Sequence, residues 1–164
     1  MIDNVKNFVQ YYDGIRQRTL KYVRSIPAEN IAWSPKEGEF SFGEIVRHIV
    51  AIEQMITGLV VEGVVRYQGH NLDAGMTCGD LVRELETEHQ TAMRLLELLG
   101  DGCLASRRKA IDGTYVKVWR LLMTMVEHEI HHRSQLAVYL TLLEIEAPQL
   151  YDLGVDDVIA AAIN

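Results

Sequence analysis

Apolar residues recur every three or four positions through most of the chain, and this spacing predicts amphipathic helices rather than strands. A first stripe runs over about residues 3–26. A second begins after Ser41, which forms the sequence signature of a capping box with Glu44, and it ends near Gly63. The chain therefore opens with two predicted helices.

The same spacing predicts two more long helices, over residues 77–99 and from Gly113–Thr114 to about Leu143, followed by a short helix over Val155–Ile163. The period breaks in segments expected to be loops, chiefly Val64–Met76 and the basic stretch Arg107–Lys109. Four amphipathic helices bury their stripes together in a four-helix bundle. We therefore expect an all-α fold with a short C-terminal helix and one domain over residues 1–164, with the order of the helices left open.

Composition narrows the range of partners. The 164 residues are 48% hydrophobic and 24% charged, as in a globular domain that needs no disulfide or metal to hold its core. Sixteen Lys and Arg face 23 Asp and Glu, and no basic patch extends beyond the three residues Arg107–Lys109, so a nucleic-acid partner is not expected. Cys78 and Cys103 form no disulfide framework, and the N-terminus is unlike a signal peptide. Long apolar runs are also lacking. We therefore expect a cytoplasmic protein that does not bind membranes.

Three histidines lie where a bundle core would otherwise be apolar. His128 and His132 are separated by one helical turn and lie within roughly 20° of their helix's apolar seam, so both imidazoles can reach one metal ion. His48 lies about 60° from the apolar seam of its own helix, the second predicted one, and is the predicted third ligand. A lone inward histidine is more often a core residue, but one divalent cation satisfies three together and leaves a fourth position open.

The remaining histidines are better explained without a metal. His131 and His89 each lie about 80° from their seams, and His70 falls in the glycine-containing connection. We therefore expect His131 on the flank of its helix, His89 at the border of the apolar stripe and His70 in a loop.

Several other residues are candidates to surround the site. Arg16 and Glu88 fall on apolar stripes, and we expect them either to pair with each other in the core or to line a pocket. Glu53 is a candidate hydrogen-bond acceptor for a ligand histidine, and Tyr12 and Trp33 are candidates for the pocket wall.

Two rival metal motifs fit less well. Residues 128–132 read H-E-x-x-H, as in zinc proteases where the glutamate, here Glu129, activates water; no histidine follows to complete that site, and no sheet is predicted to hold a peptide. A di-iron site needs inward glutamates on further helices. The first helix has none, and Glu86 points roughly 140° away from its stripe. A mononuclear three-histidine site remains.

These residues together resemble the DinB family, the DinB/YfiT-like metal-binding four-helix bundles. The resemblance rests on four segments, namely Trp33–Pro35, Phe40–His48 with the following Glu53, His128–Leu136 and Pro148–Leu153. It implies one divalent ion, typically Zn²⁺ or Ni²⁺, held by His48, His128 and His132. Where many members have glycine after the His-Arg pair, this chain has Ser134, a small residue that is expected to allow close helix approach while changing the pocket wall.

The resemblance also implies a class of reaction. Some members are similar to transferases in which a low-molecular-weight thiol such as bacillithiol or mycothiol binds the metal as thiolate, because an ion with an open position lowers the pKa of a bound thiol. Others resemble metal-dependent hydrolases, for which Glu129, Glu53 or Glu88 would be the base. A non-enzymatic metal-binding stress-response protein is the third hypothesis. The family's frequent pairing of bundles makes a homodimer a further expectation.

Overall fold

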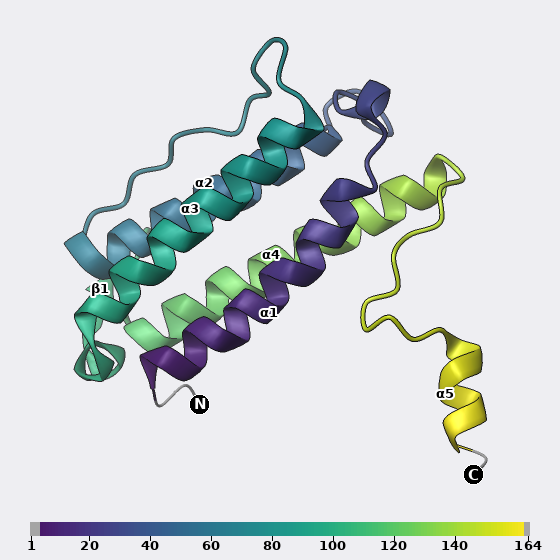
Figure 1. Ribbon diagram of the computed structural model, residues 1–164. Coiled ribbons are helices and arrows are strands. Elements are labelled where there is room, and N and C mark those ends of the chain that lie inside the picture. Colours follow the sequence, from purple (N-terminus) through teal and green to yellow (C-terminus); the bar gives the residue numbers. More distant parts are fainter. Residues whose placement is uncertain (1–3, 163–164) are drawn as a thin grey trace.

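A computed structural model describes residues 4–162 and shows an all-α four-helix bundle with a small hairpin (Figure 1). The helices of the bundle are α1 (Val5–Arg24), α2 (Phe42–Glu62), α3 (Cys78–Leu99) and α4 (Val118–Leu142), and a short helix α5 (Val155–Ala162) follows. The predicted fold class is confirmed. Across residues 4–162, no helix combines the length and apolar character that a bilayer span requires.

Side-chain caps fix the ends of α2 and α3 where the sequence predicts them. The Ser41 hydroxyl accepts a hydrogen bond from the Glu44 backbone N–H at 3.3 Å, and the Glu44 carboxylate accepts one from the Ser41 N–H at 2.8 Å. Gly63 ends α2 with a φ of 74°, a conformation that glycine adopts without steric cost. Thr77 and Asp80 form the equivalent capping box on α3.

The predicted start of α4 at Gly113–Thr114 is wrong. Residues Tyr115–Lys117 form strand β2, which pairs antiparallel with β1 (Arg107–Lys109), so the expected basic loop is half of a hairpin. Val116 is half-buried between two exposed neighbours, which is the alternation of a strand. Three residues are too few for that alternation to stand out from the helical spacing that follows.

Smaller differences concern the chain between and beyond the helices. The predicted first helix begins at residue 3, outside the described residues, and α1 ends at Arg24, two residues early. The predicted end of α5 at Ile163 also lies outside the described residues. Two short 3₁₀ helices, Ala28–Asn30 and Asp101–Ala105, occupy connections where none was predicted.

Helices α2 and α3 run parallel, and this explains the long connection between them. Arg47 on α2 approaches Glu84 on α3, and Gln54 further along α2 meets Glu88 further along α3. The 21 residues of α2 span about 31 Å, so the chain must return that distance before α3 can begin. The connection after Gly63 runs back along the bundle in Figure 1.

A polar layer divides the core at mid-bundle. Both α1 and α2 pack against α3 and α4, so α1 and α2 lie diagonally opposite each other. One apolar cluster fills the end that holds the start of α1 and of α4, and a second fills the other end. Buried polar side chains lie between the two clusters, among them Arg16, Glu53, His89, Glu129 and His132.

Candidate metal centre

The three predicted ligand histidines come together on the facing sides of α2 and α4. The Nε2 atoms of His128 and His48 are 3.0 Å apart, and those of His132 and His128 are 3.1 Å apart. Candidate ligand atoms of all three lie within 4.8 Å of one another. Two ligands of a tetrahedral zinc ion with bonds near 2.0–2.1 Å are separated by about 3.3 Å. The donor atoms therefore fit a single divalent ion.

Hydrogen bonds on the outer ring nitrogens orient these imidazoles. The Nδ1–H of His132 donates to the Gln135 side-chain oxygen at 2.6 Å, because an amide oxygen only accepts. Nδ1 of His48 lies 2.8 Å from the Tyr67 hydroxyl, which also contacts Nδ1 of His70. When Tyr67 donates to His70 and accepts from His48, the inner Nε2 of His48 keeps its lone pair. Such outer contacts fix the ring and tautomer of metal-binding histidines.

The surroundings favour the neutral form of all three rings. Burial lowers the pKa of His48 to about 4, and His132 and His70 add to the shift. Burial lowers the pKa of His128 to about 3, with smaller contributions from the neighbouring histidines. Burial also lowers the pKa of His132, although its hydrogen bond to Gln135 opposes this. Neutral imidazole is the form that binds a metal.

A small hollow adjoins the histidines. Its volume is about 150 Å³. It is lined by Gly38, Glu39, Phe40, His132, Gln135 and Tyr139. The Phe40 ring lies 5.3 Å from the His48 ring and 4.3 Å from the His70 ring, centre to centre, so Phe40 forms an aromatic side of the site. The hollow leaves room for a small ligand beside His132.

Arg16 lies in the polar layer and binds Glu129, not Glu88. Its Nη2 is 2.8 Å from Glu129 Oε2 and 3.1 Å from Glu53 Oε2, and all three side chains are buried. It also donates to the Tyr12 hydroxyl at 3.3 Å. Burial raises the pKa of the Glu129 carboxyl, but the Arg16 charge and the hydrogen bonds from Thr19, Tyr12 and Arg16 together outweigh it, and the pKa falls. The predicted pairing of Arg16 with Glu88 is therefore wrong.

Glu53 lies against His89, and not against a ligand histidine as the sequence suggested. Its Oε1 is 2.6 Å from Nδ1 of His89, whose Nε2 is 2.7 Å from Asp13 Oδ1. His89 is buried here, whereas its position about 80° from the seam predicted a border residue. Helix phase drifts along a real bundle, and an error of tens of degrees decides the environment of a residue at the edge of a stripe.

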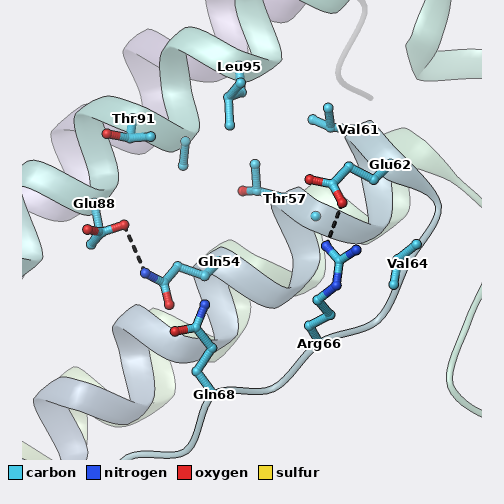
Figure 2. Close-up of a pocket in the computed structure, with 12 residues that line it drawn as sticks. Gln54, Thr57, Val61, Glu62, Val64, Arg66, Gln68, Glu88, Thr91 and Leu95 are labelled. Carbon is cyan, nitrogen blue, oxygen red and sulfur yellow. Dashed lines mark hydrogen bonds and ion pairs between the residues drawn. The ribbon is translucent and has the colours of Figure 1, made fainter.

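Glu88, Trp33 and His131 lie outside the cluster of ligand nitrogens. Glu88 accepts a hydrogen bond from Gln54 at 2.8 Å, at one side of a pocket of about 200 Å³ between α2 and α3 (Figure 2). Trp33 packs its ring against Tyr139 at 5.5 Å, and the residues that line the small hollow do not include it. His131 is exposed, with its ring 4.9 Å from that of His132.

Sequence reasoning missed four residues around the histidines. Tyr67 and His70 lie in the connection after α2, where no periodic pattern marks them, and Phe40 precedes the α2 cap. Gln135 carries a usable signal, because a residue three positions after a helical ligand lies on the same face. The other three depend on how the loops fold over the helices.

Comparison with known proteins agrees with this architecture. The DinB superfamily matches residues 11–136. A DinB-like protein from Bacillus cereus ATCC 10987 has a similar structure, with a TM-score of 0.74 and 20% identity over 91% of this chain and 99% of its own. A DinB-like protein from Bacillus subtilis gives a TM-score of 0.72 and 26% identity over 88% and 96% of the two chains. A search of curated proteins found no match.

Proposed function

The chain belongs to the DinB superfamily, and from that premise we propose that it holds one Zn²⁺ or Ni²⁺ ion and uses it in a thiol-dependent transfer reaction. His48, His128 and His132 are the proposed ligands. The observation that carries the proposal is the convergence of their three Nε2 atoms. Burial, which favours the neutral form of each ring, supports it. Three protein ligands leave a fourth position for a substrate, as in catalytic sites.

When bound, such an ion supplies a Lewis acid that lowers the pKa of a coordinated thiol, so that thiolate exists at neutral pH. The chain's own residues provide the rest of the site. Gln135 and Tyr67 hold the outer nitrogens of two ligand rings. Phe40 packs against the His48 ring, and the adjoining hollow receives the small reacting group. We propose a low-molecular-weight thiol of the bacillithiol or mycothiol type as the nucleophile.

The three glutamates that the sequence offers as hydrolytic bases, Glu129, Glu53 and Glu88, are all engaged in other hydrogen bonds. A hydrolase needs a free carboxylate as base, and both oxygens of Glu129 accept hydrogen bonds from Arg16. Glu39 lines the hollow beside His132 and is the better placed carboxylate for a hydrolytic reaction. If hydrolysis is the reaction, Glu39→Gln should abolish it with the metal retained, whereas a catalytic Glu129 would make Glu129→Gln the inactive variant.

Elemental analysis of untagged protein prepared without chelators tests the metal site. We expect about one ion per chain in the native protein and almost none in His48→Ala. His131→Ala is the matched control, because His131 is a neighbouring histidine outside the ligand cluster. Full occupancy of His48→Ala would refute the ligand assignment.

Cobalt substitution separates an enzyme from a protein that only stores or senses metal. An open coordination position should bind azide or a small thiol and change the visible spectrum of the cobalt protein. A fourth protein ligand would leave that spectrum unchanged, and this result would favour the non-enzymatic hypothesis.

We also propose that the protein acts in the reducing cytoplasm and as a homodimer. Free Cys78 and Cys103 support the first proposal, since neither forms a disulfide. The exposed apolar side chains of α5 support the second.

A further inference from the structure

A second and larger hollow follows the seam between α2 and α4, with a volume of about 510 Å³. We call it the apolar groove. Its walls include Met55 and Leu59 on α2, Leu121 and Thr124 on α4, and Ile111 and Val116 of the hairpin. Arg120, at the rim, forms an ion pair with Glu127 at 3.0 Å. The groove therefore offers an almost entirely apolar surface in the size range of small-molecule sites.

The apolar groove continues the two helix faces that carry the ligand histidines. On α4, Thr124 lies one turn before His128, on the same face and about 6 Å along the axis. On α2, Met55 lies two turns after His48, about 10 Å along. These helices are antiparallel, since Phe40 before α2 meets Tyr139 late in α4 while His48 meets His128. Both faces thus lead from the histidines in the same direction.

We propose that the apolar groove binds an aliphatic or aromatic arm of the substrate whose polar end reaches the metal centre. This inference rests on the proposed function and specifies its substrate class, an uncharged apolar chain attached to a metal-binding head such as a thiol. The small hollow at Phe40 and the groove lie on opposite sides of the histidines along α4, at Gln135 and at Thr124. An arm that enters the groove from the metal would run along α4 from His128 to Thr124, about 6 Å of helix. Ile111, 73% exposed, would be covered by such an arm.

Chain length is the variable that tests the proposal. Straight-chain alkanethiols from ethanethiol to hexanethiol are titrated into the cobalt-substituted protein, and binding is followed by visible absorption. Each methylene buried in the groove should tighten binding by about two- to fourfold. Azide, which has no arm, measures access to the metal alone.

A matched pair of variants locates the effect. Thr124→Trp fills the apolar groove from an exposed helical position, and Thr141→Trp adds the same bulk elsewhere on α4. The two threonines are comparable, because each hydroxyl donates to the carbonyl four residues earlier at 3.0 Å. We expect Thr124→Trp to flatten the dependence on chain length with azide binding kept, and Thr141→Trp to behave as the native protein.

The outcomes separate this inference from the proposed function. If azide binds and all the thiols bind with the same affinity whatever their chain length, the proposed role of the groove is refuted and the metal site stands. A cobalt spectrum that responds to neither azide nor thiol would overturn the proposed function and the inference with it. In metal-free protein, N-phenyl-1-naphthylamine should bind the native chain and not Thr124→Trp, and equal binding would refute the groove. If the native protein is a dimer and Thr124→Trp is a monomer, the groove binds a second copy of the chain and not a substrate arm.

Discussion

Arg16 is the most deeply buried arginine among residues 4–162. It is 1% exposed and contacts the carboxylates of Glu129 and Glu53, while Nη1 donates to the Leu85 carbonyl at 2.9 Å. The Nδ1–H of His89 supplies one further donor to Glu53, at 2.6 Å from Oε1. Removing the guanidinium would leave two buried carboxylates without their principal positive partner, and neither can be rehydrated cheaply in the core.

We predict that Arg16→Met lowers the free energy of unfolding by about 3–5 kcal/mol, because breaking one side of a buried ion pair exposes the other to an apolar medium. Arg24→Met is the control. Arg24 pairs with Glu86 at 2.7 Å, but with its side chain half exposed, so its loss should cost at most about 1 kcal/mol. Urea unfolding followed by circular dichroism measures both. Equal losses would show that the polar layer contributes little more than a surface pair.

At the scale of the elements, the connection after α2 supports the metal site because of the order of the helices. Parallel α2 and α3 require the chain to cross the length of the bundle between them, and this return path carries Tyr67 and His70 past His48. A direct turn between antiparallel neighbours would have no residues to spare for such contacts. The topology therefore supplies the outer hydrogen bond of one ligand.

Tyr67→Phe tests that contribution, since it removes the hydroxyl that joins His48 to His70 and keeps the ring. Loss of such an outer contact typically weakens metal binding 10- to 100-fold. We expect the lower end of this range, because Tyr67 is 43% exposed and water can replace its hydroxyl. Competition with a coloured chelator measures the affinity, and Tyr115→Phe on β2 provides an exposed tyrosine far along the chain as control. An unchanged metal affinity in Tyr67→Phe would show that the connection after α2 does not contribute to metal binding.

Elements with strong local signals were predictable, and contacts between distant segments were not. The capping residues Ser41 and Thr77 fixed two helix starts, and helix phase placed His48, His128 and His132 together. Strand β2 has only three residues, so its alternation was lost in the spacing of α4. The contact between Tyr67 and His48 depends on a helix order that loop lengths alone leave open.

At the scale of the whole molecule, two apolar clusters on either side of the polar layer make the fold independent of the metal. Each cluster draws residues from all four long helices, so neither end of the bundle relies on the histidines for its packing. A native-state ligand still adds stability by mass action, by about 4 kcal/mol at a concentration 1,000 times its Kd.

Chelation should therefore lower the melting temperature without unfolding the protein at 25 °C. Circular dichroism melts with and without EDTA measure the effect, and His48→Ala should melt at the same temperature in both. Loss of the helical signal at 25 °C on chelation would contradict the prediction and show that the metal holds the bundle together.

Helix α5 presents an apolar surface that a second copy of the chain is expected to cover. None of its residues is buried, and Val155, Val158 and Ile159 are 76%, 55% and 51% exposed. In Figure 1 it lies beyond the end of the linker, apart from the four long helices. Contiguous exposed apolar patches of this kind mark interaction surfaces in most soluble proteins.

We therefore predict a homodimer that depends on α5. Sedimentation velocity should give a dimer for the native chain and a monomer for the double variant Val158→Asp and Ile159→Asp. Leu98→Asp is the control, since Leu98 is 84% exposed but lies on α3, so that variant should stay dimeric. A native chain that sediments as a monomer at every concentration would refute the dimer, and a dimeric double variant would move the interface away from α5. Because α5 is separate from the four long helices, two of which carry the ligand histidines, loss of the dimer should leave the metal content unchanged.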